Sequence, residues 1–406
     1  MWMNAISSSP SVTAVTDREA YIVLNMISGI GPARLAALLE FSPDPAGIFS
    51  LPEQELLRIP GISAPLAKKI LNWEKEIDLT KEIQMIERGG VDLLIPTDDA
   101  YPANLKEIHN APICLYVRGK IPADITQHGI AMVGTRNISH YGSEQARRLA
   151  EAASYAGWIV VSGLAVGTDT IVHRATVNAG GKTVAVLGGG LARLHPQENL
   201  QLARDIISTG GAIITEFPMT FSPSRHTFPM RNRIISGLTQ GTIVVEAGIN
   251  SGSLITAAHA IEQGRRVFAV PGNVDSGSTS GCNSLIRKGA ILIENFEHVL
   301  EEFDFLPGFD SVQPMLLREE QDEDIAYEPN DSANISSQAF PAEEQLQLGP
   351  AADAIMDALK KGDLSIESLT VQTGFPAHDE LLSAAIALEI MSRVKRNPDG
   401  SLRRLR

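Results

Sequence analysis

Six short apolar runs between about residues 126 and 300 constrain the fold of this chain more than any other feature. They read GIAMVG, GWIVVSG, KTVAVLGGG, GAIITE, GTIVVEAG and RRVFAVPG, and segments of helical length separate them. Such nearly continuous Val, Ile and Ala runs are typical of strands that are buried on both faces, as in a parallel sheet covered by helices. We therefore predict an α/β fold with a Rossmann-like, doubly wound, mostly parallel sheet, in a domain that spans residues 81–305.

The distribution of charge separates this domain from a smaller C-terminal unit. The formal net charge of the 406 residues is -14, but residues 301–345 alone hold thirteen Asp or Glu and one Arg, a local net charge of -12. A segment with so few large apolar residues cannot bury enough surface to order itself. We predict an acidic disordered linker at 306–346, which acts either as a solvated spacer or as a competitor for a basic groove.

The first 80 residues have the apolar periodicity of helices, interrupted by Gly-containing turns. The stretches SGIGPARLAALL and IPGISAPLAKKI each resemble a helix-hairpin-helix unit, so we predict a helix-hairpin-helix or SAM-like domain over 1–80. Two roles are open for this domain. Its turns and helix N-termini can bind a DNA phosphate, or it can be a compact helical domain that packs on a partner or on the main body.

The last 60 residues predict three helices followed by a basic hairpin. RVKRNPDGSLRRLR carries six basic residues and one Asp, and Asp399-Gly400 is a hairpin signal. We predict a winged-helix domain over 347–406. The segment expected to be its recognition helix, HDELLSAAIALEI, is acidic and apolar, without the Arg, Lys, Asn or Gln that read base edges.

Three of the loops that follow predicted strands are suited to binding phosphate. The first, MVGTRNISHYG, offers the donors of Arg136 and Ser139; the second contains Ser162 and Gly163; the third contains three successive glycines around Gly189. Glycine allows close approach of a ligand or of another backbone, and the carboxyl ends of parallel strands meet at one edge of the sheet. Together the three loops indicate a phosphate-bearing ligand at this edge.

Several catalytic and metal-binding motifs are not found in the sequence. It contains no G-x-G-x-x-G dinucleotide fingerprint after the first strand, no Walker loop and no G-x-S-x-G elbow. The two cysteines, which we expect to be buried, and the nine histidines show no metal-ligand spacing. We expect His173, four residues after Asp169 on a predicted helix, to form a hydrogen bond with it rather than to act in catalysis. We predict neither a metal nor a catalytic site.

The stretch SPSRHTFPMRNRIISG concentrates the remaining candidates. Arg225 can place two donors on a phosphate and Phe228 can stack on a base. Two roles are open for Arg231 and Arg233: ligand contact, or pairing with Glu216 and Glu246 at the sheet edge. These two glutamates end predicted strands, and each is either a general base or an acceptor of hydrogen bonds from loop N–H groups.

Long stretches of this domain resemble the DNA-processing protein A (DprA, also called Smf) family. The similarity covers about 130 to 292 and is carried by GIAMVGTRNISHYG, VSGLAVGTDTIVHRA, FPMRNRIISGL, SGSLIT and VFAVPG. The resemblance implies sequence-independent binding of single-stranded DNA, delivery of the strand to the RecA recombinase during natural transformation, and a homodimer through the Rossmann-like domain. It also implies no cofactor and no catalytic activity.

Carried onto this chain, the resemblance places the DNA pocket at Arg136, Ser162, Gly163, Arg225 and Phe228, and at the loop Asn250, Ser251, Gly252 and Ser253. His195 stands where a tyrosine is expected in GLARLHPQEN, which makes a stacking role there an open question. The resemblance does not account for the acidic linker.

Two other functions are alternatives. Nucleotide phosphoribohydrolases share a related fold, but here EAGINSGSLITA lacks the adjacent glycine and the downstream Glu of their P-G-G-x-G-T-x-x-E loop. A regulator would read duplex DNA with the winged helix and sense a nucleotide with the main domain. The chain has no run of eighteen apolar residues and its N-terminus lacks the basic and apolar order of a signal peptide, so a cytoplasmic protein is expected.

Overall fold

The computed structural model describes residues 15–304, residues 350–373 and parts of the segment from 381 to 405. The first 14 residues and the acidic linker predicted at 306–346 lie outside the described residues.

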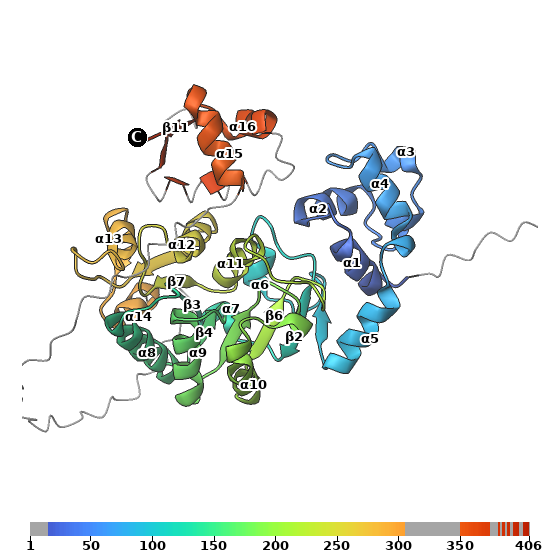
Figure 1. The fold of residues 1–406 in the computed structure, drawn as a ribbon. Helices are drawn as coiled ribbons and strands as arrows, with labels where there is room; N and C mark the ends of the chain where they lie inside the picture. Colours follow the sequence, from blue (N-terminus) through green and yellow to red (C-terminus); the bar gives the residue numbers. More distant parts are fainter. Residues whose placement is uncertain are drawn as a thin grey trace, which may run out of the picture.

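A nine-stranded sheet forms the centre of the molecule, with the strand order β1-β2-β6-β5-β4-β3-β7-β8-β9 (Figure 1). All six of the apolar runs form strands of this sheet. The strands are β1 (Asp92–Leu94), β2 (Leu115–Gly119), β3 (Gly129–Val133), β4 (Ile159–Ser162), β5 (Thr183–Val186), β6 (Ala212–Thr215), β7 (Gly241–Val244), β8 (Arg266–Ala269) and β9 (Ile291–Leu292).

The seven strands from β3 to β9 are parallel, whereas β2 pairs antiparallel with β6 and β1 antiparallel with β2. The chain winds outward from β3 through β4 and β5 to β6, returns to β7 on the other side of β3, and continues to β8 and β9. The direction of winding therefore reverses between β3 and β7. This confirms the predicted doubly wound, mostly parallel sheet, and the crevice at such a reversal is where open α/β sheets bind ligands.

Helices cover both faces of the sheet because successive side chains of each strand point to opposite faces. Ala131 and Val133 of β3 pack with α11, α12 and α13, whereas Ile130 and Met132 pack with α8, α9 and α14. Figure 1 shows these two helical layers on either side of the strands. The helices of this domain are α6 (Ala103–Lys106), α7 (Ile125–His128), α8 (His140–Tyr155), α9 (Thr168–Asn178), α10 (Leu200–Ser208), α11 (Thr227–Gly237), α12 (Ser253–Glu262), α13 (Ser280–Arg287) and α14 (Glu297–Asp304), with the 3₁₀ turns η3 (Leu191–Arg193) and η4 (Gln197–Asn199).

The N-terminal unit is helical, as predicted, and it shares a hydrophobic core with the sheet. It contains α1 (Asp17–Met26), α2 (Pro32–Phe41), η1 (Gly47–Ser50), α3 (Glu53–Leu56), α4 (Ala64–Leu71), η2 (Trp73–Lys75) and α5 (Leu79–Gly89). Its buried side chains form one cluster with Leu93 of β1, Tyr116 of β2 and Met219. This contact supports the packing role for the helical unit, and the core continues across the predicted domain boundary at residue 80.

Arg34 joins the two hairpin turns of this unit. Its guanidinium donates to the carbonyl oxygens of Gly29 and Gly61, at 2.5 and 3.0 Å. Both glycines have positive φ, at 104° and 81°, a conformation that L-residues rarely adopt.

The described part of the C-terminal unit contains α15 (Pro350–Ala358), η5 (Leu359–Lys361), α16 (Ile366–Thr373) and an antiparallel hairpin of β10 (Val394–Arg396) and β11 (Leu402–Arg404). It lies beside the layer of α11 to α13 in Figure 1, and the Lys288 ammonium donates to the Glu389 carbonyl oxygen at 3.5 Å. Two helices and a basic hairpin follow the predicted order. Most of the expected third helix and the Asp399-Gly400 turn lie outside the described residues, so the winged helix stays a prediction.

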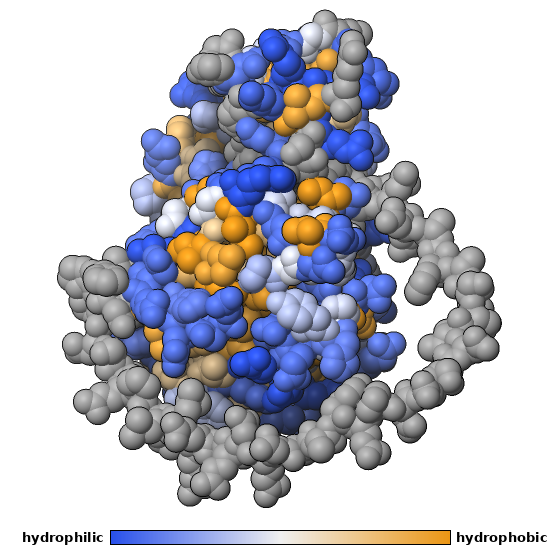
Figure 2. Space-filling model, turned by 90° about the vertical axis from the view of Figure 1, so that its left-hand side faces the viewer, coloured by the Kyte–Doolittle hydropathy of each residue, from blue (hydrophilic) through white to orange (hydrophobic). Residues whose placement is uncertain are grey.

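The last strand of the sheet, β9, is an edge strand, and Leu292 in it is 44% exposed. Figure 2 views the side of the molecule that carries α13 and α14 and shows an apolar patch in the middle of that face. Among the residues that the structure describes, none of the helices combines the length and apolar character needed to cross a bilayer.

Candidate nucleic-acid interface

The loops after β3, β4 and β7 are bonded to one another at the point where the winding of the sheet reverses. The Thr135 N–H donates to the Glu246 carbonyl oxygen at 2.8 Å, and the Thr168 N–H donates to the Thr135 carbonyl oxygen at 3.2 Å. Gly134 fits only without a side chain, because a Cβ there would lie 2.4 Å from the Thr168 hydroxyl oxygen. The loop that carries Arg136 is therefore held from both sides.

Glu246 acts as an acceptor within these loops. Its side chain is fully buried, and it accepts hydrogen bonds from the Ser139 N–H at 2.8 Å and the Ser278 hydroxyl at 2.6 Å. The Ser139 hydroxyl oxygen in turn accepts from the Gly142 N–H at 3.0 Å, as the N-cap of α8. The geometry supports the acceptor role of Glu246 over general base, and it gives Ser139 a structural task.

Arg233 forms a bidentate ion pair with Glu216. The two N···O distances are 2.5 and 2.6 Å, and the side chains of Arg233 and Glu216 are only 11% and 10% exposed. The Arg233 Nε also donates to the Asn110 carbonyl oxygen at 2.9 Å. For Arg233 the structure therefore favours pairing with Glu216, the bracing role, over contact with a ligand.

Arg231 is buried under the loop after β4 and is 3% exposed. Its Nη1 donates to the Val186 carbonyl oxygen, and its guanidinium lies against Gly163, where a Cβ would come within 1.8 Å of Nη1. Burial lowers the pKa of Arg231 to about 10, and the nearby Asp169 carboxylate partly offsets this shift. Gly163 therefore makes room for a protein side chain, and the guanidinium braces the strand ends from inside.

The expected hydrogen bond between Asp169 and His173 is wrong. The Asp169 carboxylate accepts instead from the Gly163 and Ala165 N–H groups, at 3.2 and 3.3 Å, and the His173 Nδ1 pairs with the Thr183 hydroxyl at 2.7 Å. The His173 Nε2 is buried without a hydrogen-bond partner, and burial beside Arg231 lowers the pKa of His173 to about 3. Asp169 is therefore bonded to the loop before its own helix and His173 to β5, so the i, i+4 spacing on the helix does not pair them.

Ser162 and the glycine run around Gly189 also serve the fold. The Ser162 hydroxyl is fully buried and donates to the Met132 carbonyl oxygen at 2.7 Å. A Cβ at Gly189 would lie 2.9 Å from Pro223, and one at Gly190 would lie 2.1 Å from the Pro218 carbonyl oxygen. The close approach that these glycines allow is therefore that of the protein's own segment before α11.

Phe228, in the first turn of α11, lies against a cation and an imidazole. The Arg136 guanidinium carbon is 5.0 Å from the centroid of the phenyl ring, and the centroid of the His195 ring is 6.3 Å away, with a 44° angle between the rings. Arg136 and His195 are exposed, and Phe228 is half-buried. The replacement of tyrosine by histidine therefore keeps an aromatic ring beside Phe228.

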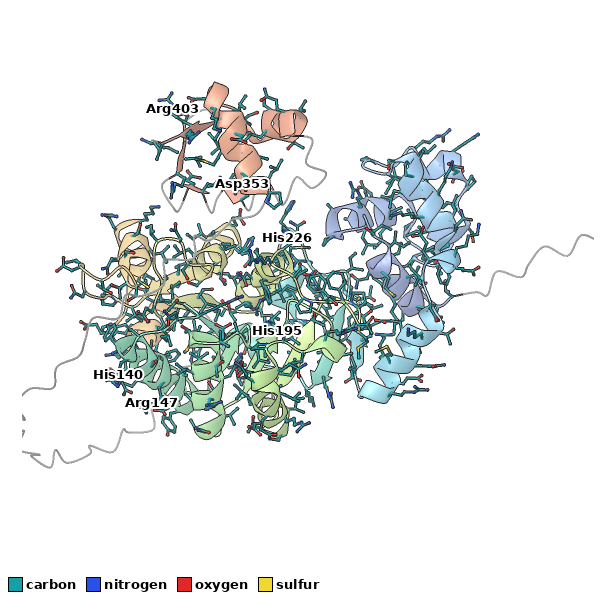
Figure 3. The ribbon with its side chains drawn as sticks, in the orientation of Figure 1. His140, Arg147, His195, His226, Asp353 and Arg403 are labelled. Carbon is teal, nitrogen blue, oxygen red and sulfur yellow. The ribbon has the colours of Figure 1, made fainter. Side chains whose placement is uncertain are left out.

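Two further loops carry exposed candidates. Arg225 and His226 are exposed just before α11, and Figure 3 locates His195 and His226 on the molecule. Asn250 is exposed in the loop before α12, where the Ser251 and Ser253 hydroxyls lie 2.8 Å apart and Gly252 is the N-cap. His226 is a candidate that the sequence analysis missed; its position next to Arg225 was the available signal.

The candidates thus form two groups. Exposed side chains come from the loops after β3, β5, β6 and β7, and those of Arg136 and His195 lie against Phe228, whereas the buried group holds the loops in place. The exposed group is Arg136, His195, Arg225, His226 and Asn250, and the half-buried Phe228 belongs with Arg136 and His195. Cys114 and Cys282 are buried, as expected, and within 15–304 and the described C-terminal parts no three His, Cys, Asp or Glu side chains gather as a metal site.

Comparison with known proteins assigns this architecture to a family. The model of DNA recombination-mediator protein A matches residues 92–304, more than half of the chain. The chain belongs to the DNA recombination-mediator protein A family. The model of the SAM-like helix-hairpin-helix tandem matches residues 21–72, which confirms the N-terminal prediction.

Members of the DNA recombination-mediator protein A family from several bacteria are similar to this chain. DNA processing protein DprA of Bacillus subtilis is 41% identical over 224 residues, which cover 55% of this chain and 75% of that protein. Protein Smf of Escherichia coli is 37% identical over 250 residues, covering 62% of this chain and 66% of that protein, just under two thirds of its length.

A solved structure of the same family agrees with the fold. The X-ray structure of DNA processing protein A from Streptococcus pneumoniae superposes with a TM-score of 0.61 at 33% identity, covering 71% of this chain and 99% of that chain. The predicted membership of the DprA/Smf family and the predicted Rossmann-like fold are confirmed.

Proposed function

We propose that this protein binds single-stranded DNA without sequence preference in its main contacts, at the edge of the sheet where the winding reverses. The observation that carries the proposal is the exposed cluster in which Arg136 lies over the half-buried ring of Phe228. A base stacks on any aromatic face, and an arginine next to that face can move to the phosphate. Membership of a family of recombination mediators supports this function.

In the proposed complex, a base takes the place of the Arg136 guanidinium on Phe228, next to the His195 ring. Arg136 and Arg225 then contact the phosphates on either side, and Asn250 with the N-terminus of α12 borders the strand. Unstacked bases occur in single strands, so duplex DNA would offer Phe228 no free base face. The buried arginines take no part in this contact, and they hold the loops at the right spacing.

The proposed role is binding rather than catalysis. Glu216 is paired with Arg233, and Glu246 accepts from Ser139 and Ser278, so both strand-end carboxylates already have partners. This supports the binding role over the phosphoribohydrolase alternative. Release of a free base from nucleoside monophosphates during incubation with the protein would contradict it.

We further propose that the bound strand is passed to the RecA recombinase and that two copies of the chain associate through the Rossmann-like domain. The exposed edge strand β9 and the apolar patch on its side of the molecule fit self-association (Figure 2). Sedimentation of the protein as a monomer at micromolar concentration would contradict the dimer. A strand-exchange reaction whose rate is the same with and without the protein would contradict delivery to RecA.

A fluorescence titration with oligo-dT and with duplex DNA of equal length tests the DNA site. Phe228→Leu keeps an apolar side chain but removes the stacking face, so the dissociation constant for oligo-dT should rise about 5- to 150-fold, equivalent to about 1–3 kcal/mol. Arg225→Ala should weaken binding and reduce the slope of log affinity against log salt by about 0.7.

Two matched variants control for unspecific effects. Phe41→Leu removes a ring that is 45% exposed on α2, and Arg148→Ala removes an exposed cation on α8; both should bind oligo-dT like the unchanged protein. Equal affinity for duplex and single strand, or loss of affinity in the controls, would contradict the proposed site.

A further inference from the structure

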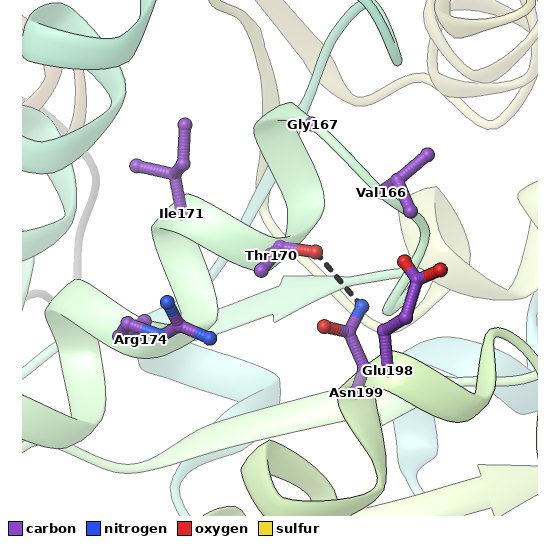
Figure 4. Close-up of a pocket in the computed structure, with 7 residues that line it drawn as sticks. All are labelled: Val166, Gly167, Thr170, Ile171, Arg174, Glu198 and Asn199. Atoms are coloured by element: carbon purple, nitrogen blue, oxygen red, sulfur yellow. Dashed lines mark hydrogen bonds between the residues drawn. The ribbon is translucent and has the colours of Figure 1, made fainter.

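A depression lies between the loop after β4, α9 and η4 (Figure 4). Its volume is about 330 Å³, within the range of small-ligand sites. The residues that line it come from the loop after β4, from α9 and from η4; they are Val166, Gly167, Thr170, Ile171, Arg174, Glu198 and Asn199.

Two backbone segments connect the lining of the depression to the proposed DNA site. The backbone of Gly167 packs against that of Thr135 and Arg136, since a Cβ at Gly167 would lie 2.5 Å from the Arg136 carbonyl oxygen. His195, beside Phe228, is three residues before Glu198 in the same segment. A strand with one base on Phe228 therefore has a neighbouring nucleotide within reach of this depression.

The walls combine apolar surface with fixed hydrogen-bonding groups. Val166 is 38% exposed, and Ile171 contributes a second aliphatic side chain from α9. The Asn199 amide nitrogen donates to the Leu164 carbonyl oxygen at 2.9 Å and to the Thr170 hydroxyl at 2.8 Å. Both bonds hold the amide in place, with its carbonyl oxygen as the remaining acceptor.

Two exposed charges of opposite sign border the same depression. Figure 4 shows the Arg174 guanidinium extending from α9 and the Glu198 side chain rising from η4 on another side of it. The carboxylate repels phosphate, which makes the depression unsuited to the backbone of the strand. A carboxylate and an amide oxygen instead accept from an exocyclic amine, and a guanidinium donates to a carbonyl oxygen.

We propose that this depression binds a nucleobase of the strand held by Phe228, and that it selects guanine or cytosine. These two bases carry both an amine and a carbonyl oxygen, whereas thymine lacks the amine and adenine lacks the carbonyl oxygen. The inference rests on the proposed single-strand site and adds a base preference at one position to contacts that are otherwise independent of sequence. Glu198 and Arg174 are the residues that determine it.

Titration of the full-length protein with oligo-dT, oligo-dA and oligo-dC of equal length tests the preference. Because one well-placed pair of hydrogen bonds discriminates by about fivefold or more, oligo-dC should bind at least about fivefold more tightly than oligo-dT and oligo-dA. In Glu198→Gln the amide can also donate to thymine, so the ratio between oligo-dT and oligo-dC should fall toward one. Arg174→Ala should instead reduce the ratio between oligo-dA and oligo-dC, because adenine is the base that lacks the carbonyl oxygen.

Glu297→Gln is the matched control, since Glu297 is exposed in the first turn of α14, and it should keep the wild-type ratio. Tight binding with equal affinities for the three strands would overturn the base preference and leave the single-strand site intact, whereas failure of every strand to bind would overturn the proposed function itself. A preference for oligo-dC that persists in Glu198→Gln would place its origin elsewhere and overturn the assignment.

Competition with a mononucleotide tests whether the depression binds a base of the strand or a free nucleotide. Deoxycytidine monophosphate should displace oligo-dC only at concentrations far above the dissociation constant of the strand. A mononucleotide that binds more tightly than oligo-dC would overturn the proposal, because the depression would then be a separate nucleotide site.

Discussion

Arg233→Met is the sharpest test of the division between residues that hold the loops and residues that contact DNA. The substitution removes the guanidinium but keeps a long apolar side chain. It leaves the Glu216 carboxylate, whose side chain is 10% exposed, without its two-pronged partner. Breaking a buried ion pair in this way costs about 3–5 kcal/mol. At about 2–4 °C per kcal/mol for a domain of this size, Tm should fall by about 6–20 °C.

A double-mutant cycle in thermal unfolding separates the pair from other effects. Glu216→Gln introduced into the Arg233→Met background removes the unpaired charge, so the double variant should be more stable than Arg233→Met alone. A loss in the double variant equal to the sum of the two single losses would refute coupling between these side chains.

The same variant, titrated with oligo-dT well below its Tm, tests the second half of the argument. Arg233→Met should bind within about twofold of the unchanged protein and keep the salt slope, because no phosphate contact has been removed. If the folded variant loses affinity and its salt slope falls by about 0.7, Arg233 contacts DNA and the bracing role is refuted.

Two further predictions concern the buried group under the loop after β4. Gly163→Ala would place a Cβ 1.8 Å from Arg231 Nη1, so the free energy of unfolding, measured with denaturant, should fall by about 3 kcal/mol, the upper end of the cost of overpacking. Gly277→Ala is the control: a Cβ there would have no atom within 4 Å, so the free energy of unfolding should stay nearly unchanged. The pKa of His173 is lowered to about 3 in the fold, so below about pH 6.5 the unfolded chain binds a proton that the folded protein does not, and the free energy of unfolding should fall by up to about 1.4 kcal/mol per pH unit. His173→Asn should remove this share of the dependence of the free energy of unfolding on pH. If that dependence had the same slope at pH 7.5, 6 and 5, the assignment would be contradicted.

The sequence predicted the sheet because its signal is strong and repeated. Nearly continuous runs of β-branched and small apolar residues are typical of strands that are buried on both faces, and Gly or Ser at the carboxyl end of several runs marks the loop edge. The strands β1, β2 and β9 escaped prediction. The edge strands β1 and β9 have only three and two residues, and the near-edge strand β2 is buried in its first three residues but not in its last two. The antiparallel pairing of β2 with β6 depends on long-range contacts that have no local sequence signal.

The chemistry of individual side chains was less predictable than the fold. Arg225, Arg231 and Arg233 are alike in the sequence, yet one is exposed, one is buried under Gly163 and one is paired with Glu216. The rotation of 100° per residue along a helix does not determine these orientations. The partner of Arg231 is Val186 in β5 and the partner of Arg233 is Glu216 just after β6, both outside the helix. His173 likewise pairs with Thr183 of the neighbouring strand β5, whereas Asp169 accepts from the loop just before its own helix, so neither partner follows from the helical spacing of the two residues.

The shared core between the helical unit and β1 and β2 ties the DNA-binding loop to the N-terminus of the chain. The Asn25 amide donates to the Glu216 carbonyl oxygen at 2.8 Å, and the Glu82 carboxylate accepts from the Met219 N–H at 2.7 Å, so both residues grip the start of the segment that leads to Arg225. A fragment trimmed to residues 92–304 would expose the apolar surface that this unit covers and release both anchors. The helical unit therefore stabilises the binding loop through direct contacts and is not a separate module on a flexible tether.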